Sequence, residues 1–481
     1  MKIKDEKKDD KCDKMMQKVI SSHESNTEVE LSPVFRFLFF LVFIFFSIVI
    51  HSENFIRLKY KLNLNTKPEI ICKTITYILI SFIPIEYINK LTTLLSILLK
   101  TIIIYFPIQN YTSNIFIIYI YYFLNNFMNF FLFIFFRIWV DQLAQKKIKS
   151  IILYFYHITP IISTMIVELI SQSDKIYINS SNLFILSYII AATLVIFVFF
   201  PSNYFHISGA FIYHKKITRK YSTLSDEEVD YDSMSLFNFE ENEEENDESI
   251  KYETFLSIFT IPAYIFSVYA KTCLVFMTEM ISIYLDDLVK RENNFENIKN
   301  IIAIFGALFG GILSIFIGNY EQKYSCLMVA IFSSIDLIIV FMSSHVTNSE
   351  FWFCLYISIF YFMTYSFSSI IIGFISSSLR IKIKVFGLAI CELFSLYLGK
   401  ILPKKIYYLI KNIFDGKNYY SWKFSCFYFL AAYFSILLAC TFSYRDINRK
   451  EKKMNIKKEK MKNLEDDKEL ELKCLGPNNN V

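Results

Sequence analysis

Glycine is scarce in this chain, and its distribution is uneven. Ten of the 481 residues are glycine, and the first of them is Gly209. Transmembrane helices usually need small residues where their backbones approach closely. The residues before Gly209 must therefore use serine, threonine or asparagine at such contacts, or pack more loosely around aromatic side chains.

Paired cysteines are also missing. The nine cysteines include no CxxC pair, which is the spacing that zinc sites and redox motifs use. Cys72, Cys273, Cys391 and Cys440 fall inside apolar runs, and we expect them to be buried thiols rather than parts of a disulfide framework. We therefore expect neither a metal site nor a cofactor.

The amino terminus lacks a signal-peptide pattern. Residues 1–30 interleave lysines with acidic residues, whereas a signal peptide has a short basic start that leads directly into an apolar run. The net charge is only +5, and the lysines cluster at the ends of apolar runs. Such clustering reports on membrane topology and gives no support to nucleic-acid binding.

Apolar residues are present in excess. They make up 54% of the chain, and aromatic residues make up 18%; a soluble domain is about 45 to 50% apolar even when glycine is counted. Runs such as 33–50, 114–139 and 183–200 are long enough to cross a hydrocarbon core, which needs about 20 residues. The sequence therefore predicts a polytopic integral membrane protein.

Twelve apolar segments of spanning length can be recognised, six on each side of a central polar stretch. The first set lies at about 33–51, 70–88, 91–108, 114–140, 148–170 and 182–200, and the second at about 255–285, 300–318, 325–344, 351–377, 383–402 and 423–443. The predicted fold is an all-α membrane protein in which twelve transmembrane helices form two pseudo-symmetric six-helix bundles.

This pattern divides the chain into five parts. They are a charged amino-terminal tail (1–32), a six-helix bundle (33–200), an acidic loop (201–253), a second six-helix bundle (254–443) and a basic carboxy-terminal tail (444–481). The core of the loop, SDEEVDYDSMSLFNFEENEEENDES, combines high charge with low hydrophobicity. That composition predicts a disordered linker.

Lysine and arginine indicate which side of the membrane each loop occupies. Basic residues gather at 146–149, 215–220, 380–384 and from Arg445 onward, while the loops at 109–113 and 345–350 have none. The positive-inside rule then places the basic loops and both termini in the cytosol. Basic residues within 57–67 and 404–417 fall on the opposite side and disagree with this assignment.

Two basic turns, one in each half, lead into apolar helices with the sequences QKKIKSIILYFYHITPIISTM and RIKIKVFGLAICELFSLYLGK. The first, with Asp141 before it and Pro160 in the helix that follows, resembles the link between helices 4 and 5 of major facilitator superfamily transporters. It is most similar to the Spinster-like branch, whose helix 11 closes at residues matched by Gly399 and Pro403. The resemblance implies two six-helix halves around a central cavity.

A glycine motif of the same superfamily is matched in the second half only. The stretch FGALFGGILSIFIGNYEQKYS contains Gly306, Gly310, Gly311 and Gly318 at the corresponding places, whereas the first-half stretch IPIEYINKL has no glycine. The lysines and arginine of the two basic turns have two possible roles. They pair with acidic residues of the opposite half, or they hold the loops inside beside anionic headgroups.

The resemblance places helices 1, 4, 7 and 10 around the cavity. Polar residues recur at helical spacing on the fourth, seventh and tenth segments. The expected cavity residues are Tyr122, Asn126, Asn129, Lys271, Thr278, Tyr361 and Tyr365. A lysine in the bilayer centre costs about 2.5 to 3.5 kcal/mol, so Lys271 faces water or a ligand, or forms a structural pair between helices.

A second set of charged and titratable residues is expected to gate or couple transport. Its members are Arg137, Asp141, His157, Glu279, Asp336 and Glu392. Arg137 and Asp141 are four residues apart and can pair with each other. His157, Asp336 and Glu392, together with Glu168, are candidate proton relays, because a titratable group shielded from water can change charge near neutral pH. Alternatively, each makes a single hydrogen bond while neutral. Glu279, like Lys271, should face water, a partner or a ligand.

The resemblance implies a secondary transporter rather than an enzyme, moving a small organic or amphipathic solute by alternating access. The Spinster-like branch implies a lysolipid or sphingoid lipid. Expected partners are the bilayer and the small-molecule or lipid substrate, with no nucleic acid and with protein partners and host membrane left open. Two alternatives remain: a non-transporting receptor or scaffold of the same fold, and a membrane-embedded lipid-modifying enzyme with His157 as base.

Overall fold

The computed structural model describes ten parts of the chain. They are residues 67–83, 90–105, 115–143, 149–171, 192, 255–288, 293–345, 349–379, 381–414 and 418–474. The predicted spans at 33–51 and 182–200, apart from Ala192, and the acidic loop up to Thr254 lie outside these residues. The chain divides into two compact units, and Ile381–Ile390 groups with the first unit rather than with the second.

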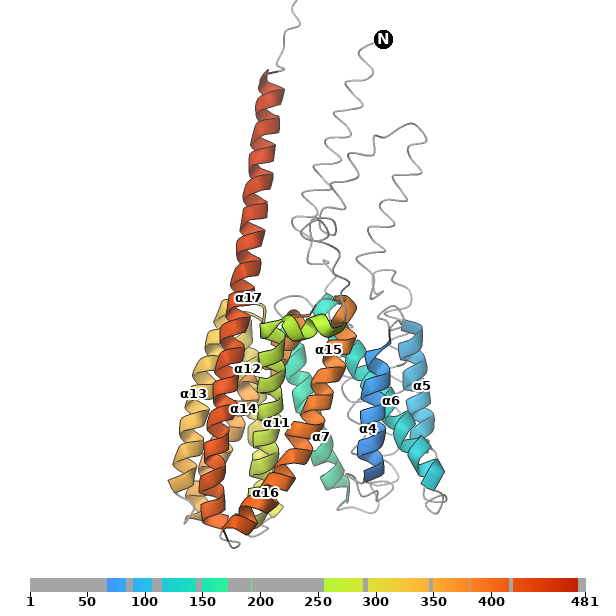
Figure 1. Ribbon diagram of the computed structural model, residues 1–481, viewed down its shortest axis with the longest axis vertical. Helices are drawn as coiled ribbons and strands as arrows, with labels where there is room; N and C mark the ends of the chain where they lie inside the picture. Colours follow the sequence, from blue (N-terminus) through green and yellow to red (C-terminus); the bar gives the residue numbers. More distant parts are fainter. Residues whose placement is uncertain are drawn as a thin grey trace, which may run out of the picture. The chain divides into compact units, whose positions relative to one another are not determined.

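Every regular element in the described ranges is a helix (Figure 1). The first half contributes α4 (Lys67–Ser81), α5 (Lys90–Tyr105), α6 (Ile115–Leu143) and α7 (Lys149–Ser171). The second half contributes η6 (Phe255–Thr260), α11 (Pro262–Leu288), α12 (Asn293–Ile317), α13 (Lys323–His345), α14 (Glu350–Ser377), α15 (Ile381–Phe394), the π-helix η7 (Ser395–Ile401), α16 (Leu402–Ile413) and α17 (Asn418–Cys474).

Seven spans in the described residues are long and apolar enough to cross a membrane. They are Ile115–Ile138, Pro262–Leu285, Ile298–Ile317, Lys323–His345, Phe351–Ser377, Ile383–Ile413 and Tyr420–Lys452. Large apolar side chains stay exposed along them, among them Phe316 at 81% and Phe116 at 72%. Such surfaces suit contact with lipid. The chain is therefore an integral, multi-pass membrane protein.

In the first unit, α6 packs against both α4 and α5. The α4–α6 contact is aromatic: the ring centroids of Tyr77 and Phe130 lie 4.4 Å apart, and Phe130 stacks on Phe133 at 5.7 Å. The α5–α6 contact contains asparagine, because the Lys100 ammonium donates to the side chains of Asn125 and Asn129. In this glycine-free half, aromatic side chains and asparagines therefore occupy the contacts between these helices.

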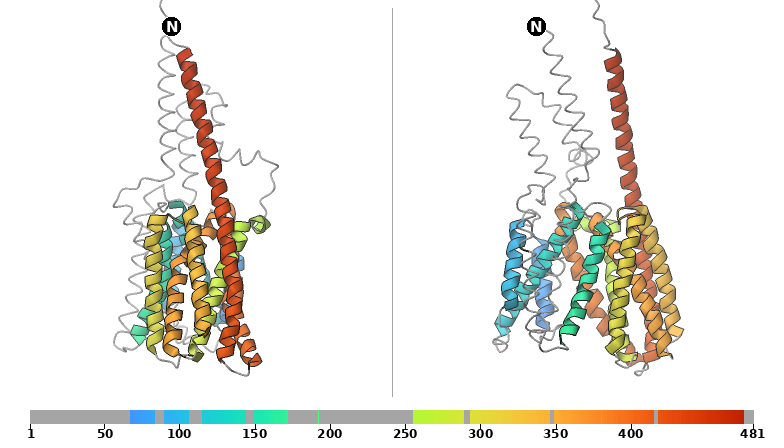
Figure 2. Two further views of the ribbon diagram at one scale, coloured as in Figure 1. Left: turned by 90° about the vertical axis from the view of Figure 1, so that its left-hand side faces the viewer. Right: turned by 180° about the vertical axis from the view of Figure 1, so that it is seen from behind.

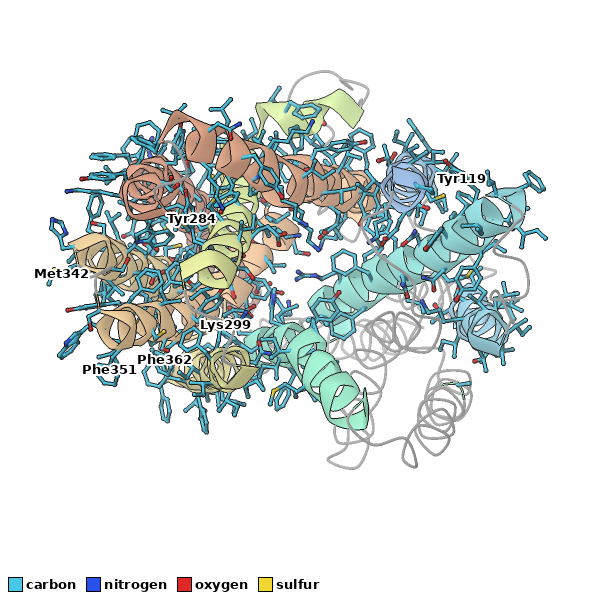
Figure 3. All side chains as sticks on the ribbon, turned by 90° about the horizontal axis from the view of Figure 1, so that it is seen from below. Tyr119, Tyr284, Lys299, Met342, Phe351 and Phe362 are labelled. Carbon is cyan, nitrogen blue, oxygen red and sulfur yellow. The ribbon has the colours of Figure 1, made fainter. Side chains whose placement is uncertain are left out.

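The second unit uses glycine where α12 meets α14. A side chain at Gly306 or Gly310 would collide with the backbone of Phe362 or Ser366, respectively. The Ser366 hydroxyl donates to the Gly306 carbonyl at 2.9 Å, across the helix boundary. Phe362 is labelled in Figure 3. The four-residue glycine spacing therefore lets two membrane helices approach to backbone contact.

The helix that begins at Ile381 does not end where the sequence predicted. The prediction stopped this span at residue 402, closed by Gly399 and Pro403, but α15 continues through η7 into α16 and reaches Ile413. Pro403 sits in the first turn of α16, where a missing N–H costs little, and the π-turn precedes it. That prediction was wrong, and Lys404 and Lys411 lie on a helix rather than in a loop.

Helix α17 continues far beyond the predicted span at 423–443. Its 57 residues run without interruption to Cys474, a length of about 85 Å at 1.5 Å per residue. Figures 1 and 2 show it leaving the end of the second unit at which α11 begins. The region expected from composition to be a basic tail is thus helical for most of its length.

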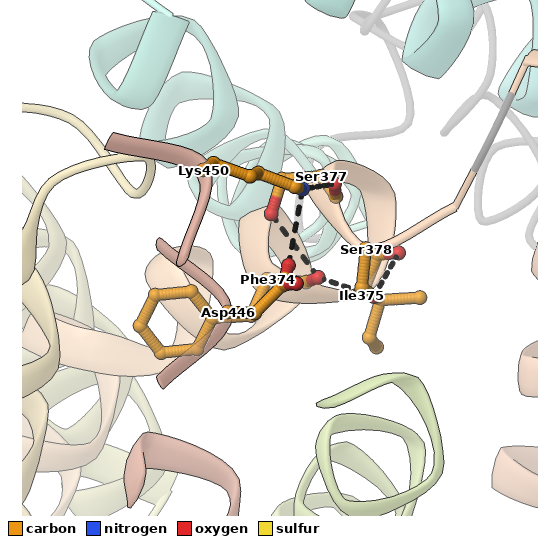
Figure 4. A network of polar contacts seen from close by, with 6 residues as sticks. All are labelled: Phe374, Ile375, Ser377, Ser378, Asp446 and Lys450. Atoms are coloured by element: carbon orange, nitrogen blue, oxygen red, sulfur yellow. Dashed lines mark hydrogen bonds and ion pairs between the residues drawn. The ribbon is translucent and has the colours of Figure 1, made fainter. Parts of the chain in front are cut away.

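Two polar contacts fasten α17 to its neighbours where it leaves them, and a third lies within the helix. The Lys323 ammonium pairs with Glu451 at 2.5 Å, which joins the start of α13 to α17. Lys450 donates to the Ser377 carbonyl at the end of α14, 2.9 Å away, and pairs with Asp446 at 3.0 Å (Figure 4). The part of α17 that leaves the bundle is therefore attached to both α13 and α14.

Candidate functional site

A lysine and a glutamate pair inside the second unit. The Lys271 ammonium on α11 donates to a carboxylate oxygen of Glu392 on α15. Their side chains are 13% and 22% exposed, so the pair lies within apolar spans without being sealed off. Charges at such positions are costly and usually mark a functional or gating pair. The sequence singled out both residues separately, and the structure brings them together.

Close backbone packing positions this pair. Gly399 lies in the π-helix η7, where an added side chain would meet Val275 and the Thr272 carbonyl of α11. Glu392 precedes Gly399 by about two helical turns, and Lys271 precedes Val275 by about one. The glycine therefore lets the two helices come close enough for the ammonium and carboxylate to meet.

A second ion pair follows on the same helix. Glu279, two turns beyond Lys271 on α11, lies 3.4 Å from the Lys404 ammonium of α16. The two side chains are 31% and 45% exposed. The charge of Lys404, which disagreed with the predicted topology, is thus balanced within the protein. A coupling role for Glu279 stays a prediction.

Tyr361, an expected cavity residue of α14, contacts a backbone carbonyl of α11 and not the side-chain hydroxyl of Thr278. The Tyr361 hydroxyl donates to the Thr278 carbonyl at 3.5 Å, while the Thr278 hydroxyl turns back to the Leu274 and Val275 carbonyls at 3.0 Å. Tyr365 stacks on Tyr361 with centroids 6.3 Å apart. The rings therefore form an aromatic surface beside α11.

Lys299 contributes a further cation to this region. Its ammonium lies 5.6 Å from the centroid of the Tyr361 ring, a cation–π distance, and Figure 3 labels it on α12. The sequence did not single out Lys299, because it lies at the edge of a predicted span, where lysines are common. Only the packing of α12 against α14 places it over a tyrosine.

Asp336 is fully buried between α13 and α14. It is 0% exposed, and its Oδ2 accepts a hydrogen bond from the Thr364 hydroxyl at 2.7 Å. Tyr433 of α17 is also fully buried nearby. A proton relay through Asp336 stays a prediction.

The first unit contains a buried lysine that the sequence interpretation missed. Lys100 of α5 is 0% exposed and donates to Asn125 at 2.6 Å and also to Asn129. The sequence interpretation did not single it out, although it stands in the middle of an apolar segment. The asparagine face of α6 was the available signal, since it requires donors on a neighbouring helix.

Replacing both Asn125 and Asn129 with leucine is expected to destabilise the first unit, because Lys100 loses two acceptors while its ammonium stays buried. Hydrogen bonds to charged groups contribute about 1.5 to 3 kcal/mol each, so the melting temperature of the purified protein should fall clearly. Adding Lys100→Met should restore most of the loss. A double variant that melts like the parent protein would contradict this assignment.

The remaining expected residues of the first half lie on α6 and α7. Arg137 is 2% exposed, and its guanidinium carbon lies 5.5 Å from the Phe133 centroid and 5.7 Å from that of Tyr156. Within the described residues, its Nε and Nη1 have no hydrogen-bond partner. The side chain of Asp141 lies outside the described set, and its pairing with Arg137 stays a prediction.

Three further residues complete the expected set. Tyr122 and Asn126 are buried on α6, and Tyr122 packs edge-on against Tyr121 at 6.1 Å. His157 is half-buried on α7, with its ring 6.1 Å from that of Tyr156. Roles for all three remain predictions.

Two lysines of the basic turns are buried rather than exposed to headgroups. Lys149 at the start of α7 is 9% exposed, and Lys384 in the first turn of α15 is 6% exposed. Both engage in further interactions within the protein. Whether these lysines pair with acidic residues or contact lipid headgroups stays open.

The described residues contain no group of three or more histidine, cysteine, aspartate or glutamate side chains that could hold a metal ion. Cys72, Cys273, Cys391 and Cys440 are free thiols, and all but Cys273 are buried. Within these ranges, ion pairs between helices join Lys271 to Glu392, Lys404 to Glu279 and Lys323 to Glu451.

Several solved structures share this fold. The E. coli fucose:proton symporter FucP aligns with a TM-score of 0.55 and 11% identity over 85% of this chain and 98% of its own. The proton:xylose symporter XylE gives 0.60 and 12% over 87% and 97%. A bacterial homologue of the iron transporter ferroportin, outward-facing, gives 0.54 and 10% over 87% and 100%. No protein-family model and no curated protein matches the sequence.

These likenesses identify the fold as that of the major facilitator superfamily. The sequence resemblance predicted the same fold from the basic turns and the glycine motif. The Spinster-like branch is not among the structures named here, and that assignment stays a prediction.

Proposed function

We propose that the protein is a secondary transporter that moves a small organic or amphipathic solute by alternating access. The observation that carries this proposal is the Lys271–Glu392 pair inside the second unit of a major facilitator fold. An intramembrane ion pair with partly exposed partners can open to bind a polar solute or close again without it. The related structures named above are described as transporters of fucose, xylose and iron.

The full proposed architecture has twelve transmembrane helices, with both termini in the cytosol. Within the second unit, the polar faces of α11 and α14 would line the path of the solute, and the aromatic rings of Tyr361 and Tyr365 suit an apolar or sugar-like surface. A lysolipid is the substrate that the Spinster-like resemblance suggests. A small sugar is the competing substrate class.

Reconstitution into vesicles tests this function. We expect saturable uptake of one member of a panel that contains a labelled pentose, a labelled hexose and a fluorescent lysophospholipid. Lys271→Ala and Asp141→Asn should each lower uptake about tenfold or more, which corresponds to about 1.4 kcal/mol of the transport barrier. Lys423→Ala, which changes an exposed lysine of α17, is the matched control.

Two results would count against this proposal. Unchanged uptake in both variants would refute the site assignment. Single-cysteine labelling from each side of the membrane addresses the non-transporting alternative, because only a transporter must expose the same cavity residues alternately to both sides. Labelling that is fixed to one side, with and without solute, would favour a receptor or scaffold, the alternative suggested by the missing glycine motif of the first half.

A further inference from the structure

Arg137 of α6 carries a buried charge that lacks an acceptor. Its side chain is 2% exposed, and it lies one residue before the end of the apolar span Ile115–Ile138. Within the described residues, its Nε and Nη1 atoms have no hydrogen-bond partner, and no ion pair reaches it. A guanidinium group has five N–H donors, and a charge at such a depth usually has a partner or a function.

Two aromatic rings hold the guanidinium group in place. Its carbon atom lies 5.5 Å from the centroid of Phe133, one turn earlier on α6, and 5.7 Å from that of Tyr156 on α7. The rings support each other, since Tyr156 lies 5.7 Å from Phe133 and stacks on Phe136 at 4.8 Å. A ring face attracts a cation but accepts only weak hydrogen bonds. The N–H groups are therefore positioned without a strong acceptor.

The same face of α6 carries a second unmatched donor. Asn126 precedes Arg137 by eleven residues, which is about three helical turns and places both on one face. Asn126 is 4% exposed, and its Nδ2 atom has no hydrogen-bond partner among the described residues. Both unmatched groups are N–H donors, so the partner that suits this face is an acceptor and not a cation.

We propose that Arg137 binds the anionic group, a carboxylate or a phosphate, of the transported solute. The planar guanidinium matches the oxygens of both groups and can bind them through two parallel N–H bonds. An anion that reaches Arg137 displaces no hydrogen bond or ion pair within the described residues. This assignment rests on the transport function proposed above, because a group that is 2% exposed must be uncovered by a movement of helices.

The assignment narrows the substrate class. Of the substrates considered above, a lysolipid with a phosphate group meets the requirement for an anion, and a neutral sugar does not. A small free carboxylate or phosphate compound meets it as well, since the guanidinium group recognises the same oxygens in each.

An ion pair with Asp141, one turn further along α6, is the competing explanation for Arg137. A structural pair stabilises the empty protein, whereas an unmatched buried cation destabilises it. Arg137→Met removes the charge and keeps a long apolar side chain. It should therefore melt at or above the temperature of the parent protein when no anion is added. A clear fall in melting temperature, matched by Asp141→Asn, would assign Arg137 to the pair and overturn the proposal.

Anion binding to the purified full-length protein in a nonionic detergent tests the site directly. The probes are radiolabelled phosphate, acetate and a lysophosphatidate, with glucose as the neutral comparison. We expect at least one anion to bind saturably and glucose not to compete. Arg137→Gln should weaken this binding at least about tenfold, because charge-assisted hydrogen bonds are lost. Arg137→Lys should weaken it too, since an ammonium lacks the planar arrangement of donors.

The three anions distinguish the two sources of the charge. Binding of phosphate or acetate through Arg137 would identify a small free anion, and binding of the lysophosphatidate alone would identify an amphipathic one. The matched control is Arg445→Gln, which changes an exposed arginine of α17 and should leave the affinity unchanged. Size-exclusion profiles check that each variant remains folded.

Equal anion affinity in the parent protein and in Arg137→Gln would overturn the proposal, as would the absence of binding for every anion. Uptake into vesicles judges the transport function separately. Anion binding at Arg137 without any uptake would refute transport alone. Uptake of a labelled hexose that Arg137→Gln leaves unchanged would refute the anion site alone.

Discussion

Gly310→Leu is expected to prevent stable folding of the second unit. A side chain at this position would lie on the backbone of Ser366 in α14, and backbone cannot move aside by changing rotamer. Overpacking costs about 1 to 3 kcal/mol where side chains can adjust, and more is expected here because the helices must separate. We expect loss of the monodisperse peak in size-exclusion chromatography and a large fall in melting temperature.

Separation of the helices would also break the hydrogen bond from Ser366 to the Gly306 carbonyl. Gly306→Leu should therefore behave like Gly310→Leu, and Gly310→Ala should be milder. Phe316→Ala is the control on the same helix, because Phe316 is 81% exposed, and it should melt within a few degrees of the parent protein. A Gly310→Leu protein with an unchanged melting temperature would show that α12 and α14 do not meet in this way.

The second large effect concerns the pair of Lys271 and Glu392. Changing either residue alone to alanine leaves its partner as an unmatched charge among apolar helices, and breaking a buried pair costs about 3 to 5 kcal/mol. Because the two side chains keep 13% and 22% exposure, we expect the lower end of that range. The double variant Lys271→Ala with Glu392→Ala should recover most of the stability.

Measuring both the stability and the uptake of the double variant distinguishes a structural ion pair from a functional one. Under the proposed function, the double variant folds but does not transport, whereas a purely structural pair would allow both. Lys404→Ala is the comparison, because its pair with Glu279 is more exposed, and exposed pairs contribute about 0 to 1 kcal/mol. Single variants that melt like the parent protein would contradict the pairing.

The sequence predicted the positions of most described helices because apolar run length is a local property. The segments expected at 114–140, 325–344 and 351–377 correspond to α6, α13 and α14 with small changes at the ends. The prediction failed at α15 to α16, where glycine and proline were taken as terminators. In that place a π-turn and a first-turn proline keep the helix continuous.

The sequence identified the residues after 443 only as a basic tail, without predicting their secondary structure. Lysine and glutamate favour helices, and pairs four residues apart, such as Asp446 with Lys450, support them. Helix α17 accordingly continues through this region to Cys474.

The candidate site was only partly predictable. The cost of burying charge singled out Lys271 and Glu392, yet they are 121 residues apart in sequence, and their pairing depends on how α11 meets α15. The same cost applies to Lys100, which was missed, and its acceptors Asn125 and Asn129 also belong to another helix. The free-energy cost of burying a charge can be read from the sequence around one residue. Which charged residues are partners depends on how the helices pack.

Because α17 is continuous, a small rotation at its base displaces its far end over a larger distance. From Arg445 to Cys474 it extends about 44 Å beyond the bundle, and its first turns are fastened to α13 and α14 by Lys323 and Lys450. A rigid-body tilt of the second unit by about 10° would move the far end of the helix through about 8 Å. A movement too small to resolve inside the membrane would thus become a displacement that a spectroscopic label at Cys474 can measure.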